Sequence, residues 1–166
     1  MCGIAGYVST NKKPTKKILK EMTDRIAHRG PDGEGHYIDE FAALGHRRLA
    51  ILDLTTGDQP IYNETKDIVV VFNGEIYNYK ELTEELKEKG HKFVTTTDTE
   101  VLVHGYEEWG HDIVNKLRGM FAFAIYDTKN KELFAARDFY GIKPFYYTKM
   151  DNTFIFGSEI KTFTIP

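Results

Sequence analysis

Hydrophobic residues gather in short runs along the chain, and their spacing predicts where strands lie. The clearest run is 67–72, in which every residue after the aspartate is apolar, as expected of a strand buried on both faces. Asn73-Gly74-Glu75 follows, and we expect the strand to end there because Asn-Gly is typical of tight turns. The same reasoning predicts strands at 4–8, 35–38, 42–47 and 92–95, and hairpins formed by 120–127 with 132–137 and by 145–149 with 153–157.

Three segments carry apolar residues at helical spacing. Thr15 is a typical N-cap for a helix over 16–27. Residues 78–81 and 97–100 each place a capping residue three positions before a glutamate, which predicts a capping box at the start of two further helices, the second reaching Tyr106. Glycines and a proline interrupt the pattern between the first helix and the strand that follows it.

The order of these elements predicts the fold class. Strands outnumber helices, and the most hydrophobic strands have no polar face, so each must be covered on both sides. We therefore expect an α/β fold of two stacked antiparallel sheets with helices outside them. Residues after Ser158 have the pattern of the start of another helix.

Composition and charge narrow the class further. The 166 residues are 41% hydrophobic and 28% charged with a net charge of -3, which is typical of one soluble domain and argues against nucleic-acid or anionic membrane surfaces. No apolar run approaches the roughly 20 residues of a membrane helix, and no signal-peptide pattern follows Met1. We expect a cytoplasmic protein. A single cysteine excludes an internal disulfide and a CxxC metal site, and we expect no metal in this domain.

That single cysteine, Cys2, lies directly behind the initiator Met1. Removal of Met1 would leave a thiol and a free α-amine on one residue, with reference pKa values of about 8.5 and 7.7–8.0, so that a nucleophile stands beside a base of matched strength. The alternative is that Cys2 is an inert small hydrophobic residue at a chain end. Partner groups elsewhere in the chain decide between these readings.

Five positions could supply such partners. Asn73 and the Gly74 amide offer two donors for an oxyanion hole, although Asn-Gly is also a common turn. Arg48 could hold a carboxylate, or could be a surface charge. Glu75 and Asp98 could hold an ammonium group, or Asp98 could cap its helix. Taken together, the groups suit an α-amino acid with a side-chain amide, and glutamine fits that description.

Six ordered motifs carry a family resemblance over essentially the whole chain. They are Cys2-Gly3-Ile4-Ala5-Gly6, Arg29-Gly30-Pro31-Asp32-Gly33, His46-Arg47-Arg48-Leu49-Ala50-Ile51-Leu52-Asp53, Phe72-Asn73-Gly74-Glu75-Ile76-Tyr77-Asn78, Asp98-Thr99-Glu100 and Arg137-Asp138-Phe139-Tyr140-Gly141-Ile142-Lys143-Pro144. The chain resembles the glutaminase domain of glutamine-hydrolysing asparagine synthetases. These belong to the N-terminal-nucleophile hydrolases, which implies a four-layer αββα sandwich and removal of Met1.

The resemblance implies a role for each site residue. Cys2 would be the nucleophile with its own α-amine as base, and Asn73 with the Gly74 amide would form the oxyanion hole. Arg48 would bind the α-carboxylate of the substrate, and Glu75 and Asp98 would bind its α-ammonium group. The rest of the pocket wall would be formed by the backbone of Leu49, Ala50, Ile51 and Leu52. We assign no chemistry to the loop from Arg29 to Gly35.

The same family carries a second, ATP-dependent synthetase domain that these residues do not resemble. We therefore expect residues 1–166 to form a glutaminase domain lacking that C-terminal partner, with ATP and Mg²⁺ as cofactors of the absent domain only. Two alternatives stay open: a related amidotransferase with another acceptor, or a domain that senses L-glutamine without hydrolysing it. The sequence also leaves open whether the chain forms a homodimer.

Overall fold

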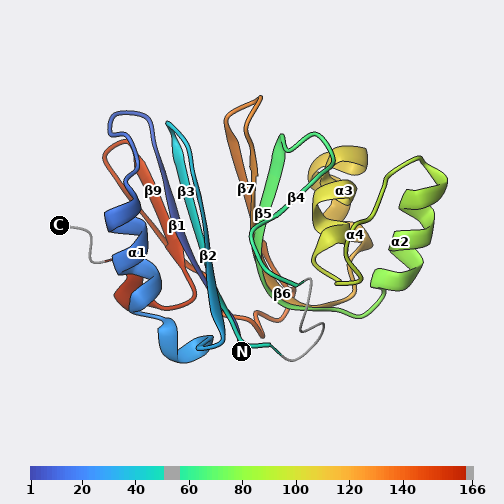
Figure 1. The fold of residues 1–166 in the computed structure, drawn as a ribbon, viewed down its shortest axis with the longest axis horizontal. Helices are drawn as coiled ribbons and strands as arrows, with labels where there is room; N and C mark the ends of the chain where they lie inside the picture. The colour runs from blue at the N-terminus through green and yellow to red at the C-terminus, as the bar shows by residue number, and fades with distance from the viewer. Residues whose placement is uncertain (51–56, 164–166) are drawn as a thin grey trace.

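The computed structural model describes residues 1–50 and 57–163, which fold into four layers. Figure 1 shows a helix, two facing β-sheets and a second group of helices in succession from left to right. This confirms the α/β class and the αββα arrangement implied by the resemblance. None of the helices in the described ranges is long and apolar enough to cross a membrane.

The first sheet has five antiparallel strands in the order β2-β3-β1-β9-β8. The central strand β1 pairs with both of its neighbours, so the chain's first residues lie in the middle of this sheet. Helix α1 packs against its outer face, with Leu19 and Met22 buried there. The elements are β1 (Gly3–Ser9), α1 (Lys16–Asp24), η1 (Ala27–Arg29), β2 (Gly33–Ile38), β3 (Ala42–Arg48), β8 (Tyr146–Met150), β9 (Thr153–Gly157) and η3 (Ile160–Phe163), where η marks a 3-10 helix.

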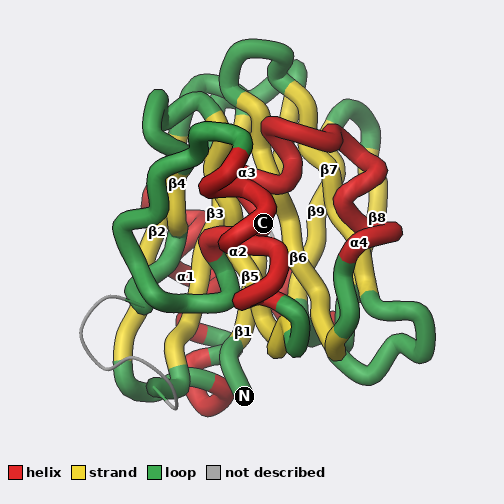
Figure 2. Tube along the Cα trace, turned by 90° about the vertical axis from the view of Figure 1, so that its right-hand side faces the viewer, coloured by secondary structure: helices red, strands yellow, loops and turns green. Residues whose placement is uncertain are grey.

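The second sheet has four antiparallel strands in the order β4-β5-β6-β7. Its outer face is covered by the second group of helices, which Figure 2 shows in front of the strands. Its elements are β4 (Ile61–Tyr62), β5 (Ile68–Ile76), α2 (Tyr79–Glu88), α3 (Glu100–Trp109), η2 (Gly110–Asp112), α4 (Ile113–Lys116), β6 (Gly119–Asp127) and β7 (Glu132–Arg137).

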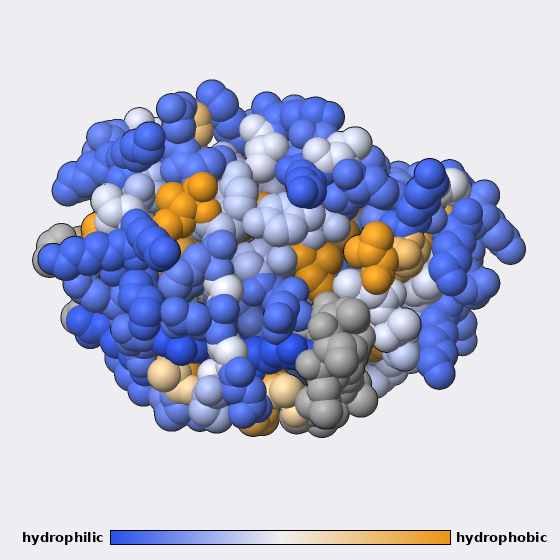
Figure 3. Space-filling model, in the orientation of Figure 1, coloured by the Kyte–Doolittle hydropathy of each residue, from blue (hydrophilic) through white to orange (hydrophobic). Residues whose placement is uncertain are grey.

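Strand β5, which contains the clearest apolar run of the sequence, is buried on both faces. Val69 and Val71 point into the core between the two sheets, where they meet residues of β1 and β9. Val70 and Phe72 point the other way and pack under α3. Large hydrophobic residues are therefore mostly internal, and Figure 3 shows a largely hydrophilic face on which hydrophobic residues form small separate groups.

The predicted end of this strand is wrong. β5 continues through Asn73-Gly74-Glu75 to Ile76, with Asn73 opposite Ala122 and Gly74 opposite Phe121 of β6. A Cβ atom on Gly74 would lie 2.2 Å from the Met120 carbonyl oxygen. Gly74 therefore serves a close approach between two strands rather than a turn.

The predicted capping of α1 is confirmed, whereas both predicted capping boxes are wrong. Thr15 accepts a hydrogen bond from the Ile18 N–H at 3.3 Å. The Asn78 side chain instead donates to the Lys116 carbonyl and accepts from the Arg118 N–H. Tertiary contacts with a distant segment thus replace the local cap at the start of α2.

Helix α3 starts at Glu100 rather than after residue 97, and the 92–95 segment before it is not a strand. Three N–H groups of the 92–95 segment donate to carboxylates: those of Val94 and Thr95 to Glu100, and that of Lys92 to Glu64. Side chains therefore take the place of a neighbouring strand. Both predicted hairpins are confirmed, and α1 ends three residues earlier than predicted.

Candidate active site

A cavity of about 810 Å³ brings most of the predicted site residues together. It draws its wall from both sheets and from the segment before α3. Its lining includes Cys2, Arg48, Leu49, Asn73, Gly74, Glu75 and Asp98. Ala50 is not part of the lining, and Ile51 and Leu52 lie outside the described residues.

Cys2 lies directly before β1, two residues from Ile4, whose side chain is in the core between the sheets. Side chains two apart on an extended chain share a face, so the thiol lies on the side that faces the second sheet. The Leu49 N–H lies 3.4 Å from Sγ, and Sγ lies 3.7 Å from the Leu49 carbonyl oxygen. Arg29 donates from Nε to the Cys2 carbonyl at 3.0 Å. The thiol is thus fixed at the end of β3.

The glycine-rich loop to which the sequence assigned no chemistry supports this thiol. A Cβ atom on Gly30 would lie 2.4 Å from the Arg47 carbonyl, so only glycine lets the loop pack this closely. The Asp32 N–H donates to the Arg48 carbonyl at 3.0 Å, and its carboxylate accepts the Ala50 N–H at 2.9 Å. The loop thereby fixes the chain on both sides of Leu49.

Asn73 points into the space between the sheets, because it alternates with the residues of β5 that face the helices. It is only 2% exposed, and its Nδ2 atom has no hydrogen-bond partner within the described ranges. A buried amide donor without a partner costs about 1–3 kcal/mol. The amide is therefore placed to donate to a group that enters the cavity.

The Gly74 N–H points to the edge of β5 that lies away from β6. Its partner Phe121 uses its N–H and its carbonyl to bond Asp138, so Gly74 and Phe121 are not hydrogen-bonded to each other. The N–H groups of Phe72 and Ile76, two residues before and after Gly74, point to the same edge of β5. Phe72 donates to Gln59 Oε1 at 2.6 Å, and Ile76 donates to Asp98 Oδ2 at 2.8 Å. The Gly74 N–H lies between them, against the cavity.

The charged groups of the cavity are of both signs. Arg48 Nη1 lies 2.7 Å from Asp58 Oδ1, so its guanidinium already binds a carboxylate in this structure. Burial, with a smaller contribution from the neighbouring charge of Glu75, raises the pKa of Asp98 to about 6 against the hydrogen bonds that Asp98 accepts. Asp98 is therefore ionised above about pH 6, when it can hold a cation beside Glu75.

His46, Lys143 and Gln59 are among the cavity residues that the sequence did not predict. His46 shares a strand face with Arg48, two positions on, and this spacing could have identified it; burial lowers its pKa to about 4, so it is neutral. Lys143 is buried, and its Nζ lies 3.0 Å from the Met1 sulfur. Gln59 reaches the cavity from a loop, and no sequence pattern marks it.

A second cluster of polar side chains lies outside this cavity. It consists of Glu64, His91, His104 and Glu107, which have the side-chain types that bind transition metals. His104 and Glu107 are one turn apart on α3, which is the only local signal in the sequence.

Comparisons with known proteins indicate the family to which the chain is related. A family profile described as a glutamine amidotransferase domain matches residues 1–165. Asparagine synthetase [glutamine-hydrolyzing] 3 of Bacillus subtilis is 46% identical over 165 residues, which cover 97% of this chain and 27% of that protein. Asparagine synthetase [glutamine-hydrolyzing] 3 of Arabidopsis thaliana is 48% identical over 165 residues, covering 97% and 28%. The chain spans about a quarter of the length of these relatives.

Solved structures share the fold at lower identity. The glutamine phosphoribosylpyrophosphate amidotransferase of B. subtilis, complexed with ADP and GMP, superposes with a TM-score of 0.81 at 22% identity. The match covers 98% of this chain and 43% of that one. At this identity the likeness shows the αββα fold alone.

Proposed function

The chain belongs to the glutamine amidotransferase domain family, and we propose that its cavity hydrolyses the side-chain amide of L-glutamine to give glutamate and ammonia. The observation that carries this proposal is the buried Asn73 amide, which has no partner within the described ranges and lines the same cavity as Cys2. A donor kept unpaired beside a nucleophile suits a reaction in which negative charge develops on an oxygen.

In the proposed reaction, the Cys2 thiolate attacks the amide carbon of glutamine once Met1 has been removed. A carbon–sulfur bond forms, and the carbonyl electron pair moves to the oxygen, which accepts hydrogen bonds from Asn73 Nδ2 and the Gly74 N–H. The α-amine of Cys2 takes the thiol proton and gives it to the departing nitrogen as the carbon–nitrogen bond breaks. Water then hydrolyses the thioester, which releases glutamate and restores the thiol.

Substrate recognition follows from the charges of the cavity. We propose that Arg48 holds the α-carboxylate of glutamine and that Glu75 and Asp98 hold its α-ammonium group. The backbone of Leu49 is proposed to line the pocket beside the thiol, since its N–H and carbonyl both face Sγ. These groups of opposite charge lie on different walls, which selects an amino acid with both ends charged.

We further propose that the ammonia serves an ATP-dependent synthetase domain in a longer chain, which makes asparagine from aspartate. Support comes from the relatives, which are named as glutamine-hydrolysing asparagine synthetases and are far longer than this chain. Phe139 and Tyr140 are 95% and 84% exposed, and such large apolar side chains suit an interface with another domain. ATP and Mg²⁺ are proposed as cofactors of that domain and not of this one.

The test is to incubate Met1-free protein with a diazo-ketone analogue of glutamine and to measure its intact mass. We expect one adduct, located on Cys2, together with equimolar glutamate and ammonia from glutamine itself. The matched control is Cys2→Ala, which should take no adduct while it still binds glutamine in calorimetry. Met1-free protein that binds glutamine but forms no adduct and no ammonia would instead support a sensing domain.

A further inference from the structure

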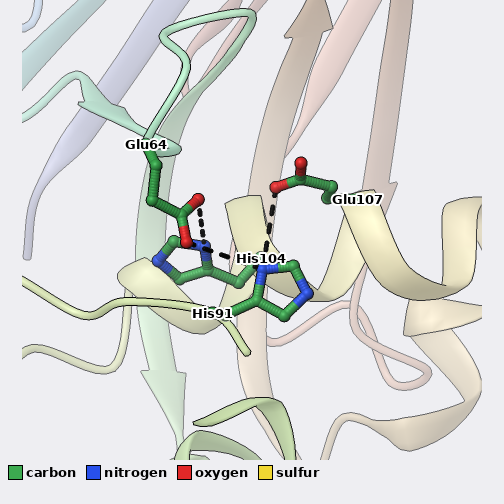
Figure 4. Close-up of side chains that lie close together, drawn as sticks. All are labelled: Glu64, His91, His104 and Glu107. Atoms are coloured by element: carbon green, nitrogen blue, oxygen red, sulfur yellow. Dashed lines mark ion pairs between the residues drawn. The ribbon is translucent and has the colours of Figure 1, made fainter. Parts of the chain in front are cut away.

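We propose that Glu64, His91, His104 and Glu107 form a binding site for one divalent transition-metal ion of the zinc class, separate from the cavity. Each residue offers one ligand atom, and the four atoms lie within 4.8 Å of one another. Figure 4 shows the side chains converging from three parts of the chain. Glu64 follows β4, His91 follows α2, and the other two lie on α3.

The distances in this cluster are close to those around a four-coordinate ion. Bonds of about 2.0–2.2 Å at a tetrahedral zinc separate its ligand atoms by roughly 3.3–3.6 Å. His104 Nδ1 lies 3.3 Å from Glu64 Oε2. His91 Nδ1 lies 3.8 Å from Glu64 Oε1 and 3.7 Å from Glu107 Oε2. All four atoms lie within 4.8 Å of one another, so the side chains would have to close in by about an ångström to bind one ion.

His104 supplies an independent observation that points to a ligand. Its side chain is 1% exposed, and Nδ1 has no hydrogen-bond partner within the described ranges. Its other nitrogen, Nε2, lies 3.2 Å from Glu100 Oε1, and a carboxylate that already accepts N–H groups requires Nε2 to be the donor. Nδ1 is then the ring atom that faces the Glu64 carboxylate, and it lies in position to bind a cation shared with that carboxylate.

Both histidines have a carboxylate on the side away from the cluster. Glu100 faces Nε2 of His104, and Glu108 Oε2 lies 3.5 Å from Nε2 of His91. Metal-bound histidines almost always donate their second N–H in this way, which fixes the tautomer and orients the ring. The same feature on both rings favours a metal site over a chance meeting of surface charges.

The donor set selects the class of ion. Two imidazole nitrogens disfavour Mg²⁺ and Ca²⁺, which take oxygen ligands, and the lack of thiolates disfavours Cu⁺. Two carboxylates balance the charge of a divalent ion. Because all four ligands come from the protein, the site has the closed coordination typical of structural zinc.

The ion would brace one wall of the cavity. His91 and His104 flank a segment that carries Asp98, and Glu100, which orients His104, also accepts the N–H groups of Val94 at 2.8 Å and Thr95 at 2.7 Å. An ion bound to both histidines therefore ties the ends of this segment to the turn that carries Glu64. Its role is structural and does not depend on the proposed hydrolysis.

The experiment titrates Zn²⁺ alone into the 166-residue protein, made without a histidine tag and stripped with chelator. Cys2→Ala is used throughout, because the Cys2 thiol could itself bind zinc. We expect one Zn²⁺ per chain in calorimetry and a rise in Tm of about 5–10 °C at a hundredfold excess over Kd. Co²⁺ should give the intense visible absorption of a four-coordinate site, and Mg²⁺ should not compete.

Two variants locate the site, and one serves as a control. His91→Ala and Glu64→Gln should each weaken binding by at least about a hundredfold. His111→Ala should bind as the parent does, since His111 also pairs with a glutamate, Glu132, but lies outside the cluster. Absence of one-to-one binding, or binding that survives both substitutions in folded protein, would overturn the proposal.

Discussion

At the scale of single residues, Asn73 shows how a functional group differs from a structural one. Most buried amides have partners, because an unpaired donor opposes folding. Asn73 Nδ2 has none within the described ranges, although it is almost fully buried. This observation supports the proposed role of the Asn73 amide as a hydrogen-bond donor to a bound substrate.

We predict that Asn73→Ala lowers kcat by about 10²–10³, because one of two oxyanion donors is lost. The free energy of unfolding should change by less than about 1 kcal/mol, since the lost packing is offset by removal of an unpaired donor. Steady-state ammonia release and urea unfolding measure the two quantities. Asn115→Ala, at an exposed asparagine, is the control and should leave both unchanged. Full activity in Asn73→Ala would exclude the oxyanion role.

At the scale of elements, β5 is both a core strand and a wall of the cavity. Its first half is apolar on both faces, and its second half carries Asn73, Gly74 and Glu75 without leaving the sheet. Pairing with the nine-residue β6 holds the strand through the dipeptide that usually turns a chain. The tertiary partner therefore overrides a strong local signal.

This close pairing predicts that Gly74→Ala destabilises the domain by about 2–3 kcal/mol, because a Cβ atom would lie 2.2 Å from a backbone oxygen of β6. Gly33→Ala is the matched control. Its Cβ would meet its nearest neighbour at 3.7 Å, and the change should cost less than about 0.5 kcal/mol. Urea unfolding followed by the fluorescence of Trp109 measures both. Equal stability of the two variants would contradict the contact.

The capping residues show which element boundaries the sequence could predict. Thr15 bonds to its own helix as its local spacing predicted. Asn78 had equally good spacing, but its side chain joins α2 to the chain before β6, forty residues on. Local patterns thus predict an element well where its polar ends face solvent, and fail where those ends meet a distant part of the fold.

At the scale of the whole molecule, the cavity depends on both sheets and on the helical layer. The position of Cys2 behind Met1, the ends of the predicted strands and the family motifs predicted Cys2, Arg48, Asn73 and Asp98, and the structure places all four around one cavity. Gln59 escaped prediction because it enters from a loop without a periodic pattern. The proposed metal ligands escaped because they are brought together by packing between three separate segments.

Two buried groups of the cavity, His46 and Asp98, give the molecule opposing responses to pH. His46 has a pKa lowered to about 4 by burial from an ordinary 6.5, so it contributes stability that is lost as the pH falls from 6.5 to 4. Asp98 has a pKa raised to about 6 from an ordinary 3.8, so its contribution grows as the pH falls from 6 to 4. Each amounts to about 3 kcal/mol over its whole range, and the two largely cancel.

We therefore predict that Asp98→Asn makes the domain lose stability more steeply in mild acid than the parent does. The asparagine oxygen can still accept the Ile76 N–H, but the proton uptake that compensates for His46 is gone. The difference in the free energy of unfolding between the two proteins should therefore change by about 2 kcal/mol between pH 7 and 4.5. Urea unfolding at half-unit pH steps measures the two curves. Asp112→Asn, at an exposed aspartate, should follow the parent. If the Asp98→Asn curve ran parallel to the parent curve, Asp98 would not have a raised pKa.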